Sequence, residues 1–347
     1  MRWFHLLRSF CSAALVALAG ASFLSESGCF DCPAIPADMQ ALWISPSGHT
    51  IAVGYSGVML ESFDDATWSV LRKGSFDSER DYNGVWGSSE TDFYVVGTEG
   101  TILHSTDGKS FSHESSGTTS ELQAVWGSGA GDVYAVGDAG TILHSTGNGV
   151  WTRQSNLGDR LVAVWGSSAT DVFAVADGGE SGGESGVASG TIFHSKGDGV
   201  WVAQQTTTSG TLGAVWGSGS ADVYVAGSAG ILHFDGSAWT VNRPAFGASA
   251  EETLDDVPSW GIWGRSADDV FVVGRDLGGA LILHGSAAGG WQTEKAVDPE
   301  MELHAVAGSA TSVLIVGARG VVLQSSGNGA WSSLVSRSPL VSARGCG

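Results

Sequence analysis

Short runs of apolar residues, each bounded by Gly, Ser, Asn or Asp, dominate the sequence. Between residues 122 and 154 four such runs follow one another, at 122–126, 132–137, 141–145 and 150–154. The second run contains VYAV, which is apolar at every position, so both faces of the strand it predicts must be buried. No segment shows the 3.6-residue period of an amphipathic helix. The pattern therefore predicts a β protein of short strands and tight turns.

This four-run phrase recurs along the chain and carries two aromatic slots. The first slot holds Trp43, Trp86, Trp126, Trp165, Trp216 and Trp263, and a seventh copy has Ala307 there. The second slot holds Trp68, Phe111, Trp151, Trp201, Trp239, Trp291 and Trp331. Aromatic residues placed this regularly are predicted to be core residues rather than a platform for a ligand. Trp260 falls outside both slots and is assigned to an insertion.

Four-stranded units of about 40–50 residues that pack face to face around an axis are propeller blades. The seven copies therefore predict an all-β fold, a seven-bladed β-propeller of four-stranded antiparallel blades over residues 39–335. We expect blades to start near residues 41, 84, 122, 161, 212, 260 and 303. Each blade is predicted to be one continuous segment, with no strand exchanged between the first and the last.

The phrase VWGSxxxDVYxVGxxGTILHS, followed by GxW, resembles the bacterial propellers related to BNR/Asp-box repeats and to the photosystem II assembly and stability factors. The segment STDGKSF at 105–111 is similar to an Asp box, one residue shorter than S-x-D-x-G-x-x-W. The resemblance covers essentially the whole chain after its N-terminal segment and implies the propeller fold. Propellers include hydrolases, lectins and scaffolds, so it implies little about activity.

The balance of charges narrows the classes of partner. The chain has 347 residues, with 16 Lys and Arg against 36 Asp and Glu, for a formal net charge of −20. Binding to nucleic acid phosphates requires clustered Lys and Arg, so nucleic acid is excluded as a partner. The same balance disfavours direct docking on an anionic membrane. It favours cationic partners and solubility.

The N-terminus resembles an export signal over residues 1–28. Arg2 and Arg8 precede the apolar segment 13–24, and small residues follow. Two cleavage sites compete. Residues 19–21 (AGA) suit ordinary signal peptidase, whereas 27–29 (SGC) resembles the end of a lipobox, in which Cys29 is the site of lipid attachment. Glu26 departs from that pattern. We expect export to a bacterial cell envelope, as a periplasmic protein or outer-membrane lipoprotein, or secretion.

Cysteine usage supports one disulfide. If Cys29 is acylated, Cys32 and Cys346 remain as a pair in an oxidising compartment. They lie in an N-terminal tether (29–38) and a C-terminal tail (336–347), where a disulfide would join the ends of the ring. The C-x-x-C spacing also fits a redox or metal motif, but no second ligand pair accompanies it.

Two polar residues recur in the repeat. The third run ends in His104, His144, His194, His233 and His284, and the second run begins with Asp92, Asp132, Asp171, Asp222 and Asp269. Packed sheets lie about 10 Å apart while Zn–N bonds are about 2 Å, so equivalent His residues cannot share an ion. We expect the His residues to form hydrogen bonds between blades and the Asp residues to accept backbone N–H groups in turns. No metal or cofactor is predicted.

Catalytic groupings are sparse. The one G-x-S-x-G, at 179–183, lies in a Gly/Ser/Glu-rich stretch rather than on a strand-to-helix turn. A sialidase would need an Arg cluster, a nucleophilic Tyr and an acid, and few Arg are present. No carboxylate pair for glycoside hydrolysis stands out. The chain is therefore predicted to be non-enzymatic.

Two insertions break the repeat, at 177–190 and 243–259, and a shorter one lies at 72–82. Because strand direction alternates within a blade, the two long insertions lie on one face. Their acidic residues form the predicted binding surface: Glu180, Glu184, Glu251, Glu252, Asp255 and Asp256. The surface would suit a basic protein segment or a cation. Gly/Ser/Glu-rich loops are also often only solvated, and that interpretation stays open.

These features predict a monomeric protein-interaction or assembly scaffold with an unidentified protein partner. The alternative is a carbohydrate-binding or glycoside-hydrolysing envelope propeller. That function would require exposed aromatic residues and carboxylates to converge at the mouth of the central channel.

Overall fold

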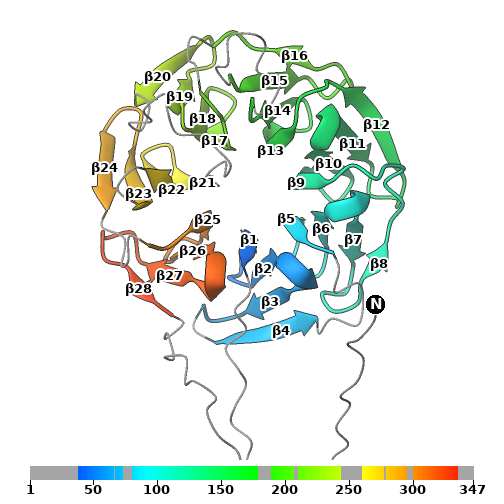
Figure 1. The fold of residues 1–347 in the computed structure, drawn as a ribbon, viewed down its shortest axis with the longest axis horizontal. Coiled ribbons are helices and arrows are strands. Elements are labelled where there is room, and N and C mark those ends of the chain that lie inside the picture. Colours follow the sequence, from blue (N-terminus) through cyan, green and yellow to red (C-terminus); the bar gives the residue numbers. More distant parts are fainter. Residues whose placement is uncertain are drawn as a thin grey trace, which may run out of the picture. The chain divides into compact units, whose positions relative to one another are not determined.

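The computed structural model describes residues 38–65, 67–72, 80–178, 189–206, 210–243, 260–276, 279–294 and 300–334. Within them 28 strands form seven four-stranded antiparallel sheets, in which each strand pairs with its neighbour in sequence. The sheets are arranged as blades around an axis, with the first strand of each blade innermost (Figure 1). The predicted seven-bladed β-propeller is confirmed.

Blades 1–3 contain the first twelve strands. Blade 1 has β1 (Met39–Ile44), β2 (Thr50–Gly54), β3 (Met59–Ser62) and β4 (Trp68–Arg72). Blade 2 has β5 (Tyr82–Gly87), β6 (Phe93–Gly97), β7 (Ile102–Ser105) and β8 (Ser112–His113). Blade 3 has β9 (Leu122–Gly129), β10 (Asp132–Gly137), β11 (Thr141–Ser145) and β12 (Trp151–Asn156).

Blades 4–7 contain the remaining sixteen. Blade 4 has β13 (Leu161–Ser168), β14 (Asp171–Ala176), β15 (Thr191–Ser195) and β16 (Val202–Ala203). Blade 5 has β17 (Ala214–Gly219), β18 (Asp222–Gly227), β19 (Gly230–Phe234) and β20 (Trp239–Arg243). Blade 6 has β21 (Gly261–Ser266), β22 (Asp269–Asp276), β23 (Gly279–Ser286) and β24 (Gly290–Glu294). Blade 7 has β25 (Leu303–Gly308), β26 (Val313–Gly317), β27 (Val322–Ser325) and β28 (Ser332–Ser333).

The second strand of each blade is buried on both faces, as its uniformly apolar sequence requires. Four blades join their second and third strands through a 3₁₀ turn whose middle residue has positive φ. The turns are η1 (Tyr55–Gly57), η2 (Thr98–Gly100), η3 (Asp138–Gly140) and η4 (Ala318–Gly320). These turns and the blade-to-blade connections leave from one face of the ring, which we call the connection face.

The first-slot tryptophans pack between blades. The ring of Trp86 in blade 2 lies against Gly127 in blade 3, where a methyl group would approach it to 2.6 Å. The same contact joins Trp43 to Gly87, Trp126 to Gly166, Trp165 to Gly217, Trp216 to Gly264 and Trp263 to Gly308. At the seam between blades 7 and 1 the sizes are reversed: Ala307 stands in the Trp position of blade 7, and Ile44 stands in the Gly position of blade 1. Glycine in V-W-G-S is thus required by the tryptophan of the preceding blade.

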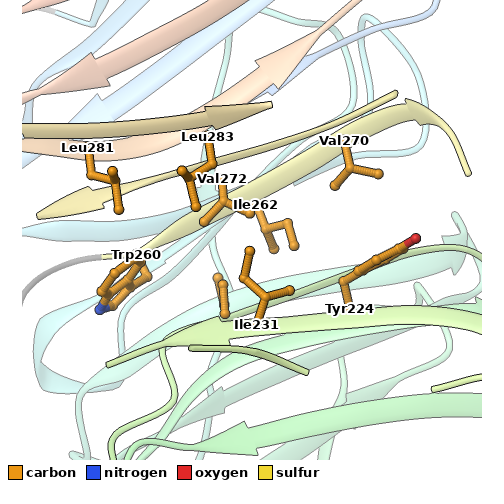
Figure 2. Packing of buried hydrophobic residues seen from close by; sticks show 10 residues of the cluster. Tyr224, Ile231, Trp260, Ile262, Val270, Val272, Leu281 and Leu283 are labelled. Carbon is orange, nitrogen blue, oxygen red and sulfur yellow. The ribbon is translucent and has the colours of Figure 1, made fainter. Parts of the chain in front are cut away.

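Apolar clusters fill the spaces between neighbouring blades. Figure 2 shows the cluster between blades 5 and 6, where Tyr224 and Ile231 face Val270, Val272 and Leu283. Trp260 belongs to this cluster and is 6% exposed. The assignment of Trp260 to an insertion was therefore wrong: it occupies the core position just before β21.

Hydrogen bonds close the ring between blades 7 and 1. His304 Nδ1 donates to the carbonyl oxygen of Met39 at 2.8 Å, and the backbone N–H of Arg319 donates to Asp38 Oδ1. An apolar cluster that includes Met39 and Val316 fills the same seam. No strand is exchanged among the described sheets. Cys29, Cys32 and Cys346 lie outside the described residues.

Candidate functional site

The recurrent His and Asp residues form hydrogen bonds inside single blades. In blade 2, His104 Nε2 donates to Asp92 Oδ1 at 2.6 Å, and the Ser88 hydroxyl donates to Asp92 Oδ2. His144, His194, His233 and His284 contact their own blades' Asp at 2.7 Å. The expected bonds from His between blades, and from backbone N–H groups to these Asp residues, were wrong. Strand register explains the result, because His104 pairs with Tyr94, two residues after Asp92.

At four of the seven seams, a different side chain links one blade to the next. Three residues after the outer aromatic of blade 2, Glu114 accepts the indole N–H of Trp151 in blade 3 at 2.7 Å. Its other oxygen contacts His104 Nδ1 at 2.8 Å. The same position holds Gln154, Asn242 and Glu294, which accept from Trp201, Trp291 and Trp331. Its regular spacing was a signal that the sequence already carried.

Blade 1 contains the same pair with the residues exchanged. His49 occupies the Asp position and Glu61 the His position, and His49 Nε2 lies 3.1 Å from Glu61 Oε2. His49 is 4% exposed and stacks on Phe63, with ring centroids 4.2 Å apart. The repeated polar residues thus have structural partners in every blade where His and an acid occur.

The Asp-box-like turn is also structural. Asp107 Oδ1 accepts the backbone N–H groups of Lys109 and Ser110, at 2.8 and 2.6 Å. These bonds lower the pKa of Asp107 to about 2. Asp235 is held in the same way in blade 5, where hydrogen bonds from Ser237 and Ala238 lower its pKa to about 2. These acids stabilise their own turns.

The six acidic residues of the predicted binding surface lie outside the described residues. These are Glu180, Glu184, Glu251, Glu252, Asp255 and Asp256. One end of the first insertion is described: Asp177 is 2% exposed and its Oδ2 accepts from Arg160 at 3.2 Å. Asp177 therefore belongs to blade 4 and not to a solvated loop.

Four charged residues act on the pKa of an exposed tyrosine on the connection face. We call this group the axial cluster, and it comprises Asp38, Tyr55, Asp81, Glu121 and Arg160. The four charged residues immediately precede β1, β5, β9 and β13, which are the innermost strands of blades 1–4 and line one side of the axis (Figure 1). Tyr55 is 43% exposed. The cluster therefore combines an exposed aromatic ring with three half-buried carboxylates.

The electrostatics of the axial cluster are dominated by its carboxylates. Burial raises the pKa of Tyr55, as do Asp81, Asp38 and Glu121, while Arg160 lowers it. Arg160 is itself paired with Asp138 and Asp177 at 3.2 Å. Asp81 is held in place by the backbone N–H of Ser56, at 2.8 Å. Three of the four charged residues that act on Tyr55 are negative, and such a balance favours a cation nearby.

A polar groove adjoins the axial cluster through Arg80, the neighbour of Asp81. The groove has a volume of about 680 Å³ and is lined by side chains that include Thr101, His113, Glu114, Ser116 and Thr118. Arg80 donates to Thr101 Oγ1 at 2.7 Å and pairs with Glu99 at 2.9 Å. The groove lies where blade 2 ends its outer strand after only two residues. The lining can form hydrogen bonds but presents no aromatic platform.

Metal-ligand clusters and membrane-spanning helices are absent from the part of the chain that the structure describes. There, no group of three or more His, Cys, Asp or Glu side chains is arranged to hold a metal ion. Among the same residues, no helix has the length and apolar character needed to cross a membrane.

Comparisons with known proteins agree with the fold. Residues 46–164, about a third of the chain, match the DUF6242 beta propeller domain. The solved structure of YCF48 bound to D1 peptide is similar with a TM-score of 0.62 and 18% identity, over 83% of this chain and 91% of that one. The structure of YCF48 from Cyanidioschyzon merolae is similar with a TM-score of 0.61 and 16% identity, over 83% of this chain and 95% of that one. The WD40 beta propeller domain of Doa1 is similar with a TM-score of 0.63 and 13% identity, over 83% of this chain and 93% of that one. No curated protein matches by sequence. The expected resemblance to photosystem II assembly-factor propellers is confirmed for the fold.

Proposed function

We propose that the protein is an exported, non-enzymatic scaffold of the cell envelope that binds a protein partner through the connection face. One observation carries the proposal: Tyr55 is exposed, and the half-buried carboxylates of Asp81, Asp38 and Glu121 raise its pKa, whereas the repeated Asp residues are each paired with a His inside their own blade. A propeller of the same fold, YCF48, has been solved with a D1 peptide bound.

The partner contributes a basic segment. Carboxylates attract Lys or Arg side chains, and the face of an exposed tyrosine ring adds a cation–π contact worth about 0.5–1 kcal/mol. A net charge of −20 adds long-range steering of a cationic partner. The acidic residues Glu180, Glu184, Glu251, Glu252, Asp255 and Asp256 extend this acidic surface in our proposal, because both insertions leave from the connection face.

The test uses the affinity-tagged chain in its native cell, with chemical crosslinking and mass spectrometry. The connection-face variant combines Tyr55→Ala, Asp81→Asn and Glu121→Gln. The matched control combines Asp107→Asn and Asp235→Asn, which removes the same number of charges from turns between third and fourth strands. We expect a crosslinked partner that the connection-face variant loses and the control keeps. Equal capture by all three chains would contradict the assignment of the face.

A second measurement tests the chemistry of the partner directly. Lys/Arg-rich and Asp/Glu-rich peptides of equal length are titrated onto the purified chain at several salt concentrations. We expect only the basic peptide to bind, with an affinity that falls as salt is added. Equal binding of the basic and the acidic peptide would refute a basic partner.

A carbohydrate-directed function is the second candidate, because an exposed tyrosine beside carboxylates is also a feature of glycan sites. Tyr55 and its neighbours meet that description. A glycan that binds the wild-type chain but not Tyr55→Ala would favour this candidate over the scaffold. Release of sugar from such a glycan would make the protein a hydrolase.

Export and lipid attachment at Cys29 form part of the proposal, as does a Cys32–Cys346 disulfide. The mass of the N-terminal peptide tests cleavage and lipid attachment. A Cys29→Ser variant is the control and should lack the lipid. Peptide masses before and after reduction test the disulfide, and free thiols at both positions would refute it.

A further inference from the structure

Three turns between the third and fourth strands have the same backbone but different side chains. Their sequences are Gly-Asn-Gly at 147–149 and 327–329, and Gly-Asp-Gly at 197–199. Asn148 Oδ1 accepts the Val150 N–H at 3.0 Å, and Asp198 Oδ1 accepts the Val200 N–H at the same distance. Asn328 accepts the Ala330 N–H at 3.1 Å. The turn therefore accommodates a carboxylate as well as an amide.

The choice between Asn and Asp in these turns follows the charge of the nearby side chain in the preceding blade. A β-carbon on Gly149 would lie 3.7 Å from Glu114 Oε1, and one on Gly329 would lie 3.8 Å from Glu294 Oε1. At Gly199 the nearest group is the amide of Gln154, at 3.9 Å. The neutral Asn thus follows a blade that supplies Glu, and the acidic Asp follows a blade that supplies Gln. This arrangement keeps two carboxylates from meeting at one seam.

Asn148 and Asn328 have the features that allow the following backbone nitrogen to attack the side chain. Both are exposed and precede an exposed glycine with positive φ, +78° at Gly149 and +81° at Gly329. Glycine has no Cβ to obstruct the approach of its nitrogen to the Asn carbonyl carbon. Each Asn is bonded through its oxygen, and the described contacts include none to its amide nitrogen.

We propose that Asn148 and Asn328 are sites of spontaneous deamidation, and that the new carboxylates weaken the seams with the preceding blades. The nitrogen of Gly149 bonds to Cγ of Asn148, and the amide nitrogen leaves as ammonia with the proton that the glycine nitrogen gives up. Water then opens the resulting succinimide to Asp or isoaspartate. The product adds a negative charge one residue before the glycine that lies nearest to Glu114 or Glu294.

Asn83 provides an internal control, because it also precedes a glycine. It lies within β5, where its Nδ2 donates to Glu121 Oε1 at 2.8 Å and to the Leu122 carbonyl at 3.0 Å. Gly84 is buried in the sheet opposite Val96. The amide of Asn83 is held and its glycine is enclosed, so this site is predicted to be inert in the folded chain.

The first experiment incubates the folded chain at mildly alkaline pH and follows the three peptides by mass spectrometry. We expect loss of the amide at positions 148 and 328 while position 83 keeps it. Unfolded chain serves as the reference, in which position 83 also reacts. Retention of the amide at 148 and 328 for as long as at 83 in the folded chain would overturn the assignment of these sites.

The second experiment measures the effect on the seam with variants that need no ageing. We expect Asn148→Asp to lower the denaturant midpoint of unfolding, and Glu114→Gln in the same chain to reduce that loss. The substituted amide would still accept the Trp151 N–H, as Gln154 does for Trp201 at 3.2 Å. Asp198→Asn is the control and is expected to leave the midpoint unchanged. An unchanged midpoint in Asn148→Asp would refute the seam effect.

Discussion

Glu114 of blade 2 accepts the indole N–H of Trp151 of blade 3 at 2.7 Å, while its other oxygen contacts His104 Nδ1. This carboxylate connects the hydrogen-bonded side chains inside one blade to the outer tryptophan of the next. Trp151 also packs edge-on against Tyr94, with centroids 5.9 Å apart. A single residue thus couples the internal order of a blade to its packing against its neighbour.

The contribution of this bond is tested by comparing two tryptophans in the same slot. Trp151→Phe leaves Glu114 without its N–H donor and should cost about 1.5–3 kcal/mol of unfolding free energy, the range for hydrogen bonds to charged groups. Trp68→Phe should cost less, because the Trp68 indole nitrogen is buried without a partner among the described residues. Urea denaturation measures both, and equal losses would contradict the role of the bond.

The exchanged pair in blade 1 predicts a compensating double mutant. His49→Asp alone places a second acid beside Glu61 and should destabilise the fold by about 1–3 kcal/mol. Adding Glu61→His restores the order found in the other blades, with Ser45 in the position from which Ser88 donates to Asp92. We expect the double variant to recover most of the lost stability in thermal unfolding. A double variant less stable than either single one would refute the equivalence of the two arrangements.

The tryptophan–glycine seam predicts a sharp contrast between two glycines of β9. Gly127→Ala forces a methyl group against Trp86 and should cost about 1–3 kcal/mol, as overpacking usually does. Gly129→Ala meets no atom within 4 Å and should change stability by less than about 0.5 kcal/mol. Chemical denaturation of the two variants gives the comparison. A Gly127→Ala chain as stable as wild type would show that the seam relaxes.

The repeat predicted the fold because the sequence of each blade contains the same pattern of strands and turns. The partners of its polar residues were harder to predict. His104 was assigned to the wrong neighbour because register, and not spacing alone, places it beside Asp92. The axial cluster could not be predicted, since Tyr55 and Glu121 belong to separate blades and the sequence does not place the turns of one blade relative to those of another. Glu114 and its equivalents were missed although their spacing from the outer aromatic is regular.

Acid should weaken the turns held by Asp107 and Asp235. Hydrogen bonds lower the pKa of each carboxyl from 3.8 to about 2 in the folded chain. A depressed folded-state pKa adds stability that is complete above the unfolded value and is lost as pH falls from about 4 to about 2. Asn at both positions keeps an oxygen for the backbone N–H groups, as Asn148 does for Val150, but does not titrate. The Asp107→Asn/Asp235→Asn chain should therefore lose less stability than wild type between pH 4 and pH 2, measured by denaturant midpoints at each pH. Parallel midpoint curves for the two chains would show that these carboxyls do not contribute to acid unfolding.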